Sequence, residues 1–235
     1  MQLETKYHIL LLGGSGICGL IFTRAALEQG HTLTLYVRTP SKIPEDLSSN
    51  TRLSIIQGEL GDEEGLKKAA ACGANVFISF AGPTLGRREG TPITNALKIL
   101  YPALLSAGTF KRVLILSTAS YSAPEDTSSL KWWVAINMYI KVIGGDTYTE
   151  IRGMAEETVS LGEKIPWTLF RVPLLRGEEL DEHWNEGEMA VEACYVGDKK
   201  GRDGLFLDRG RLARWVLGEL DEGKWVGCSP LISNA

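Results

Sequence analysis

The sequence has few of the residues that build covalent or metal-held frameworks. Its 235 residues include only four cysteines, without a C-x-x-C pair, and three scattered histidines. Disulfide scaffolds and zinc sites need denser, regular spacings, so we expect reduced thiols and no metal. Positive charge is not in excess either, because 25 Lys and Arg against 29 Asp and Glu give a net charge of −4. This balance argues against a nucleic-acid partner.

Long apolar runs are also missing. The uncharged stretches 7–23 and 69–86 are interrupted by glycines, and the second contains Asn75 and Pro83. Neither stretch predicts a membrane span. The apolar run 9–12 near the N-terminus is too short for a signal peptide. We therefore expect a cytoplasmic protein without a membrane partner, either a monomer or a homodimer.

What the sequence does have is abundant glycine, 26 residues, and a repeated alternation of apolar runs with helical segments. Apolar runs predict strands at 7–12, 32–37, 53–56, 76–80, 113–116 and 167–172. Helical periodicity favours helices at 20–28, 63–72, 93–107, 147–161 and 208–220. Nearly unbroken apolar strands separated by helices are typical of a parallel sheet covered on both faces. The fold class is therefore α/β, with one doubly wound Rossmann domain over residues 1–235.

Two segments depart from this alternation. The aromatic stretch 131–143 reads KWWVAINMYIKVI. It suits a helix packed on the core or on a partner subunit, or else a lid over a substrate pocket. Membrane association is the third interpretation. The stretch 177–210 is rich in Gly, Glu and Asp, and we expect an irregular substrate-side insertion or a solvated loop with some strand at 193–196. We expect Arg209, Arg211 and Arg214 on a solvated helix face rather than at a phosphate site.

The first glycine cluster lies directly between the first predicted strand and the first predicted helix. It reads GGSGICG over residues 13–19 and contains both G-x-x-G-x-x-G and G-x-G-x-x-G. Glycine allows a tight turn and close approach of a pyrophosphate to the backbone, and the helix N-terminus offers N–H groups to the anion. In this context the pattern predicts dinucleotide binding. The candidate residues are Gly13, Gly14, Ser15, Gly16, Ile17 and Gly19.

The end of the second predicted strand indicates which dinucleotide is bound. An NAD site places Asp or Glu there to bind the ribose diol, but no acid occurs from residue 31 to 44. Arg38 and Lys42 could instead pair with a 2′-phosphate, with Thr39 as a hydroxyl donor. The alternative is that Arg38 and Lys42 are ordinary surface charges. We therefore predict NADP(H) as the cofactor.

These motifs resemble the atypical short-chain dehydrogenase/reductase superfamily, in its NmrA-like, NAD(P)H-binding branch with biliverdin reductase B-like and small fungal reductase-like proteins. The resemblance runs nearly end to end, through GGSGICG, YVRTPSK, QGEL at 57–60, FAGP at 80–83, LSTAS at 116–120 and PWTLFRVPLL at 166–175. It implies further cofactor-binding residues near the adenine, along the riboses and beside the nicotinamide. In that order they are Glu59 and Leu60; Ala81, Gly82 and Pro83; and Val172, Pro173 and Leu174. The family more often has Asp where Glu59 stands.

The resemblance also implies a catalytic set. Family members with the usual chemistry carry a Ser or Thr after the fifth strand and a Tyr-x-x-x-Lys pair on the next helix. This chain offers Ser117 or Thr118, then Tyr148 with Arg152 in place of the lysine. The i,i+4 spacing places Tyr148 and Arg152 on one helix face, where a guanidinium could favour the phenolate but not release a proton. A surface tyrosine beside a surface arginine is the alternative.

Two classes of function follow. The first is an NADPH-dependent reductase that transfers hydride to a small, largely apolar carbonyl or conjugated substrate, with isomerisation or epimerisation as a variant. Its pocket would draw on Trp132, Trp133, His183 and Trp184, with Ser117 orienting the acceptor oxygen and Tyr148 or a water protonating it. The second is a non-catalytic NADP(H) sensor that binds a protein partner, because the phosphate loop is intact while the Tyr-x-x-x-Lys pair is altered.

Overall fold

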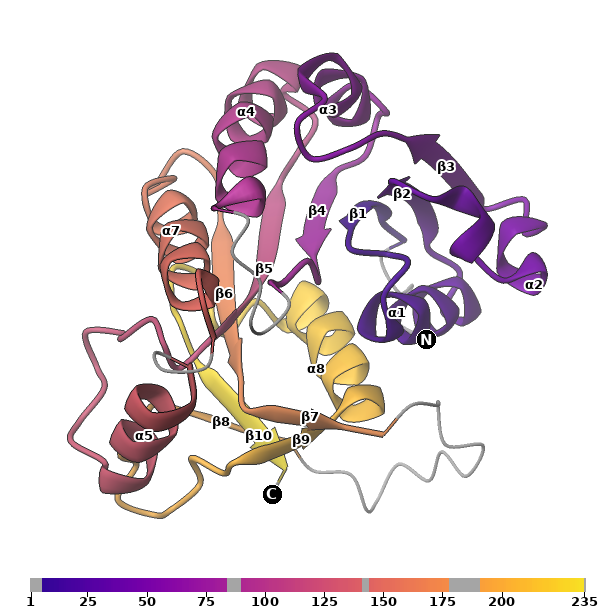
Figure 1. The fold of residues 1–235 in the computed structure, drawn as a ribbon. Coiled ribbons are helices and arrows are strands. Elements are labelled where there is room, and N and C mark those ends of the chain that lie inside the picture. Colours follow the sequence, from indigo (N-terminus) through magenta and orange to yellow (C-terminus); the bar gives the residue numbers. More distant parts are fainter. Residues whose placement is uncertain (1–5, 84–89, 141–143, 178–190, 235) are drawn as a thin grey trace.

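A central sheet with helices on both faces organises the computed structural model (Figure 1), which describes residues 6–83, 90–140, 144–177 and 191–234. The eight strands lie in the order β3-β2-β1-β4-β5-β6-β10-β8, and all neighbours are parallel except β10 and β8. Their bounds are β1 His8–Leu12, β2 Thr32–Val37, β3 Leu53–Gln57, β4 Val76–Ser79, β5 Arg112–Thr118, β6 Trp167–Val172, β8 Val191–Cys194 and β10 Leu231–Asn234.

Two groups of helices cover the two faces of this sheet (Figure 1). On one face α1 (Ile17–Glu28) packs beside α8 (Arg209–Glu222), and their apolar residues share one core cluster with the strands. On the other face lie α3 (Glu63–Ala70), α4 (Pro92–Ala107) and α7 (Thr147–Val159), with a second core cluster beneath them. The short η1 (Pro40–Lys42) and α2 (Glu45–Ser48) follow β2. The predicted doubly wound α/β fold is confirmed.

Strand β1 is the point from which the chain winds in both directions. It pairs with β2 on one side and with β4 on the other, so that Leu12 lies opposite both Tyr36 and Ser79. From there the sheet grows outward through β3 on the first side and through β5 and β6 on the second. In such sheets a crevice opens at the carboxyl ends of the strands where the order reverses. A ligand site is therefore expected above β1 and β4.

The C-terminal part contains strands that the sequence patterns did not predict. Strands β7 (Leu174–Arg176) and β9 (Phe206–Asp208) form a separate two-stranded parallel sheet, and β10 extends the main sheet beside β6. The predicted strand at 193–196 begins earlier, as β8. The predicted insertion 177–210 thus includes β8 and β9, while residues 178–190, with His183 and Trp184, lie outside the described residues.

The aromatic segment forms a short helix, α5 (Leu130–Val134), that continues into the π-helix η2 (Ala135–Ile140). Trp132 is buried, and its Nε1 donates a hydrogen bond to the Asp203 carbonyl at 3.2 Å. Trp133 is 61 % exposed. One indole thus packs on the protein itself, as the core-packing interpretation predicted, while residues 141–143 lie outside the described part.

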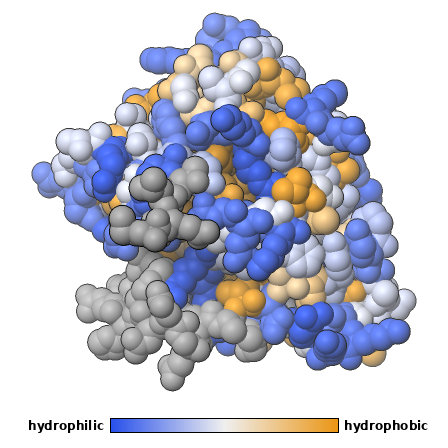
Figure 2. Space-filling view, turned by 180° about the vertical axis from the view of Figure 1, so that it is seen from behind, coloured by the Kyte–Doolittle hydropathy of each residue, from blue (hydrophilic) through white to orange (hydrophobic). Residues whose placement is uncertain are grey.

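Figure 2 shows the molecule from the side opposite to Figure 1, and on this face apolar patches are separated by polar ones. None of the helices in the described ranges is long and apolar enough to cross a membrane. The arginines of α8 contact the protein: Arg209 donates to the Gly177 carbonyl at 2.6 Å, and Arg211 lies 3.3 Å from the Asp208 carboxylate. Arg209, Arg211 and Arg214 are all half-buried, so the expected solvated arginine face is only partly exposed.

A buried ion pair fixes the carboxyl end of β6. The fully buried Arg171 donates to both carboxylate oxygens of Asp126, at 2.6 and 2.7 Å, and to the carbonyls of Tyr121 and Ser229. Asp126 also accepts the Val196 amide at 2.9 Å. Because a buried charge is tolerated only when it is paired and hydrogen-bonded, this pair holds three chain segments against β6.

Removal of the charge of Asp126 should strongly destabilise the fold. We expect Asp126→Asn to lower the free energy of unfolding by about 3–5 kcal/mol, because the Arg171 guanidinium is then buried without its counter-charge. Urea denaturation measures this loss. Glu222→Gln, which removes one partner of the exposed Glu222–Lys224 pair, is the control and should change nothing measurable. A stability loss below about 1 kcal/mol for Asp126→Asn would contradict this account.

Candidate functional site

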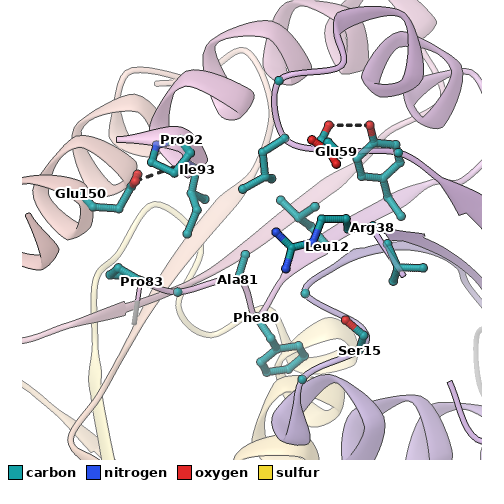
Figure 3. A pocket seen from close by; sticks show the side chains of 18 of the residues that line it. Leu12, Ser15, Arg38, Glu59, Phe80, Ala81, Pro83, Pro92, Ile93 and Glu150 are labelled. Atoms are coloured by element: carbon teal, nitrogen blue, oxygen red, sulfur yellow. Dashed lines mark hydrogen bonds between the residues drawn. The ribbon is translucent and has the colours of Figure 1, made fainter. Parts of the chain in front are cut away.

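A cavity of about 600 Å³ opens at the carboxyl ends of β1, β2, β3 and β4 (Figure 3). Its walls come from the glycine turn after β1, the segment after β2, the loop after β3, the end of β4, and the starts of α4 and α7. It brings together many of the residues that the sequence singled out. They are Gly13, Ser15, Gly16, Arg38, Thr39, Lys42, Glu59, Leu60, Ala81, Gly82 and Pro83.

Close packing requires two of the glycines in the turn between β1 and α1. Gly13 has φ +80°, and a Cβ there would lie 2.5 Å from the Ala81 amide nitrogen. A Cβ on Gly19 would overlap the Gly13 carbonyl oxygen and lie 2.6 Å from the Gly14 Cα. Residues with side chains cannot adopt this geometry without strain. These glycines therefore shape the turn, which folds tightly against the end of β4.

Close packing does not explain why residue 16 is a glycine. A Cβ there would meet nothing nearer than the Gly13 carbonyl oxygen, at 3.5 Å, yet the residue is exposed and lines the cavity. It is the N-cap of α1, and no side chain caps the helix there. The first N–H groups of a helix carry partial positive charge and lack helical partners. A bare main chain at this point suits close approach of a phosphate.

The end of the cavity beside β2 is basic. Arg38 and Lys42 are exposed and line it together with Thr39. In the described part of the chain neither Arg38 nor Lys42 has an ion-pair partner. Exposed cations beside a helix N-terminus suit a second phosphate group.

The opposite end of the cavity is formed by residues that the sequence analysis missed. The buried Glu150 of α7 accepts hydrogen bonds from the amides of Ile93 and Thr94, at 3.3 and 2.6 Å, and from the Thr94 hydroxyl at 2.7 Å. Asp146 accepts the Gly90 amide at 2.9 Å. Figure 3 shows Glu150 pointing toward Ile93. These two carboxylates bind the main chain at the start of α4 and join it to α7. The sequence carries no local signal of this pairing, because the partners are 56 or 57 residues apart.

The candidate catalytic residues do not line the cavity. Ser117, at the end of β5, is 1 % exposed, and its hydroxyl has no hydrogen-bond partner among the described residues. The guanidinium of Arg152 lies 5.9 Å from the centre of the Tyr148 ring, so the predicted shared face is confirmed. Arg152 is exposed, and it also donates to Glu156 at 2.9 Å. Hydrogen bonds with Glu156 and then Tyr148 raise the pKa of Arg152 above its usual value.

The remaining predicted residues also lie outside the cavity lining. Val172 is buried in the core, and Leu174, in β7, is 58 % exposed. Pro173 lies between them, and none of the three belongs to the walls. Gly14, Ile17 and Gly19 belong to the turn and to α1 but do not face the space either. Their assignment to the cofactor stays a prediction.

Comparison with known proteins identifies the family and the fold. The model of the NAD(P)H-binding family matches residues 13–220. No curated protein matches by sequence. Solved structures with the same fold include a short-chain dehydrogenase/reductase from Veillonella parvula in complex with NADP. It is 17 % identical with a TM-score of 0.74, and the match covers 97 % of this chain and 95 % of that one.

Two further solved structures share the fold. An oxidoreductase from Lactococcus lactis is 16 % identical with a TM-score of 0.70, over 97 % of this chain and 91 % of that one. An anaerobillin reductase from Escherichia coli O157:H7 is 12 % identical with a TM-score of 0.63, over 96 % of both chains. At these identities the likeness shows the fold alone.

A methyl group on Gly16 should obstruct the cavity without unfolding the protein. We expect Gly16→Ala to lower dinucleotide affinity about 10-fold or more, equivalent to at least 1.4 kcal/mol. The free energy of unfolding should fall by about 1 kcal/mol, because alanine is a poorer N-cap than glycine. Calorimetric titration and thermal melting measure the two effects. Gly218→Ala, in open space on α8, is the matched control and should keep full affinity; equal affinity of both variants would refute the phosphate-cradle assignment.

Proposed function

The chain belongs to the NAD(P)H-binding family, and from that premise we propose that it is an NADP(H)-dependent oxidoreductase acting on a small, largely apolar carbonyl or conjugated substrate. The observation that carries the proposal is one cavity with two phosphate-suited features. They are the open main chain at Gly16 and, beside β2, the cations Arg38 and Lys42, which have no ion-pair partner within the described ranges. A dinucleotide with an additional phosphate on its adenosine ribose matches both.

The position of the cations relative to the glycine turn supports NADP(H) over NAD(H). In doubly wound folds the pyrophosphate lies at the first helix N-terminus, and the adenosine ribose lies at the end of the second strand. Arg38 follows β2 directly, and Lys42 ends η1. The nearest lining carboxylate, Glu59, comes from the loop after β3. Arg38 and Lys42 would therefore hold the 2′-phosphate, with Thr39 donating its hydroxyl.

The walls beyond β4 support a mostly apolar substrate. Phe80, Ala81, Pro83 and Ile93 supply apolar surface there, and Figure 3 shows them between the glycine turn and Glu150. The cations that line the described cavity lie at its β2 end. Among the described residues, a substrate carboxylate would therefore face Asp146 and Glu150 without a basic partner, which disfavours it. A neutral carbonyl or conjugated compound avoids this repulsion.

In the proposed reaction the bound cofactor and the side chains of the protein have separate roles. NADPH, when bound, supplies the hydride. The Ser117 hydroxyl, buried and without a hydrogen-bond partner in the described residues, would orient the acceptor oxygen of the substrate. Tyr148, or a water molecule in its place, would deliver the proton. Arg152 would keep positive charge beside the Tyr148 ring but could not exchange a proton itself.

Loss of Arg38 should remove the preference for the phosphorylated cofactor. We expect Arg38→Ala to weaken NADP(H) binding about 10- to 100-fold, the equivalent of one charge-assisted hydrogen bond, and to leave NAD(H) binding nearly unchanged. Calorimetric titration with all four nucleotides measures this. Arg202→Ala, which removes an arginine paired with Asp198 outside the cavity, is the charge-matched control. Equal NADP(H) affinity in Arg38→Ala and the wild type would exclude Arg38 from the site.

The absence of Tyr148 from the cavity lining favours a second candidate function. Neither Tyr148 nor Arg152 lines the cavity, and Arg152 pairs with Glu156. A protein that binds NADP(H) without turning over a substrate needs neither residue. The alternative is therefore a non-catalytic NADP(H) sensor, in which the exposed Trp133 of α5 would belong to a surface for a protein partner.

Substitution of the hydroxyl groups separates these two functions. If the chain is an enzyme, NADPH oxidation against a panel of carbonyl and conjugated compounds should fall about 100-fold or more in Tyr148→Phe, the contribution typical of a general acid. Ser117→Ala should also slow turnover, and Tyr7→Phe, at the amino end of the sheet, should not. Unchanged turnover in Tyr148→Phe would remove that residue from the mechanism. Tight NADPH binding with no turnover over the panel would favour the sensor.

A further inference from the structure

Tyr36 is a buried tyrosine in the wall of the cavity that the proposed chemistry does not use. It lies in β2, two residues before Arg38, and is 4 % exposed. Its ring belongs to the core cluster beneath α3, α4 and α7, and it also lines the cavity. A buried tyrosine hydroxyl needs a hydrogen-bond partner, and the identity of that partner suggests what the residue does.

The partner is the main chain of the loop that follows β3. The Tyr36 hydroxyl donates to the Glu59 carbonyl at 2.8 Å, drawn as the dashed line beside Glu59 in Figure 3. The same carbonyl accepts the Asp62 amide at 3.1 Å, and Asp62 in turn caps α3 by accepting the Gly65 amide at 2.9 Å. One hydroxyl thus joins β2 to the loop and to the start of α3.

The neighbouring glycines leave room for this hydroxyl. A Cβ on Gly58 would overlap the Tyr36 hydroxyl oxygen, and a Cβ on Gly65 would lie 2.8 Å from it. Neither glycine has a positive φ, so backbone conformation does not explain their lack of side chains. The Tyr36 hydroxyl takes up the space that a side chain at position 58 would need, and at position 65 it does so together with the nearer Asp62 carboxylate. The loop after β3 therefore has the space that the side chain of a tyrosine at position 36 needs.

The hydroxyl remains a donor over the pH range of ordinary experiments. Burial, followed by the nearby carboxylates of Asp62 and Glu59, raises the pKa of Tyr36 to about 12. The phenol is then protonated at neutral pH, and the hydrogen bond to Glu59 is always available. The contact is thus a constant feature of the site rather than a pH-dependent one.

We propose that Tyr36 is a positioning residue for the adenosine end of the cofactor site, which it builds by fixing the main chain of residues 58–61. This inference rests on the proposed function. Gly58, Glu59, Leu60 and Gly61 line the cavity on the same side as Arg38. The Tyr36 hydrogen bond sets how far this wall stands from Arg38, and so the width of the space that receives the adenosine.

The affinities of Tyr36→Phe for NADP⁺ and NAD⁺ test this role. Both nucleotides contain adenosine, so both should bind about 3- to 10-fold more weakly, the effect of one net hydrogen bond. The ratio of the two affinities should stay at the wild-type value. Arg38→Ala should instead change that ratio, because it removes a contact to the 2′-phosphate alone. 2′,5′-ADP should lose affinity by the same factor as NADP⁺ in Tyr36→Phe.

Tyr101→Phe is the matched control. Its hydroxyl forms a buried 2.7 Å hydrogen bond with Thr158, in the same core cluster but outside the cavity. We expect it to lower the melting temperature about as much as Tyr36→Phe without loss of affinity. An equal loss of affinity in Tyr101→Phe, or a Tyr36→Phe affinity within the error of the wild type, would overturn the positioning role alone. Absence of binding by the wild-type protein would overturn the proposed function as well.

Discussion

The cavity depends on the contact between the chain leaving β1 and the chain leaving β4. Gly13 turns toward α1 directly against the Phe80–Ala81 main chain, and a side chain at position 13 would push the two apart. This contact places the N-terminus of α1 beneath the space and leaves the ends of β2 and β4 on either side of it. Because the two sides are built by different segments, they have different chemistry: basic beside β2, apolar and acidic beside α4.

Buried charges fix the half of the sheet that the glycine turn does not reach. Arg112, at the amino end of β5, donates to Glu219 of α8 at 2.6 Å, and Arg171, at the carboxyl end of β6, pairs with Asp126. Burial raises the pKa of Glu219, against the lowering effect of the Trp225 amide and of Arg112. Such pairs tolerate few alternative arrangements, because an unpaired buried charge is very costly. They fix how β5 and β6 meet α8 and the chain after β5.

The parts of the structure that local chemistry determines could be predicted from the sequence. Strands β2 and β6 have the predicted bounds, because their apolar and β-branched residues are continuous. Gly13, Gly16 and Arg38 line the cavity, as expected from residue type and position beside a strand; their contacts with the cofactor stay a prediction. Strands β7 and β9 were missed because each has three residues and a partly exposed apolar side chain, which gives no periodic signal.

Contacts between distant residues account for what the sequence patterns missed at the site. Glu150 caps α4 through Ile93 and Thr94, which lie 57 and 56 residues earlier in the sequence. No local sequence pattern indicates that pairing. Tyr36 binds a main-chain carbonyl, so no complementary side chain marks its partner. The Tyr148 and Arg152 pattern was visible, but only the fold shows which side of α7 faces the cavity. The orientation of α7 in the fold therefore determines which side chains line the substrate end of the cavity.

That geometry limits how a proton can reach a bound substrate. Residues on an α-helix are about 100° apart around its axis, so the cavity-lining Thr147 and Glu150 exclude Arg152 from the same face. Glu150 accepts hydrogen bonds from the α4 amides and the Thr94 hydroxyl through both carboxylate oxygens. A proton that it carried for transfer would compete with this cap, which joins α4 to α7. Tyr148 does not line the cavity either, so in the proposed reaction its proton would reach the substrate through a water or a hydroxyl. The proposed enzyme would therefore need a relay from Tyr148, whereas the proposed sensor, which only binds the dinucleotide, would not.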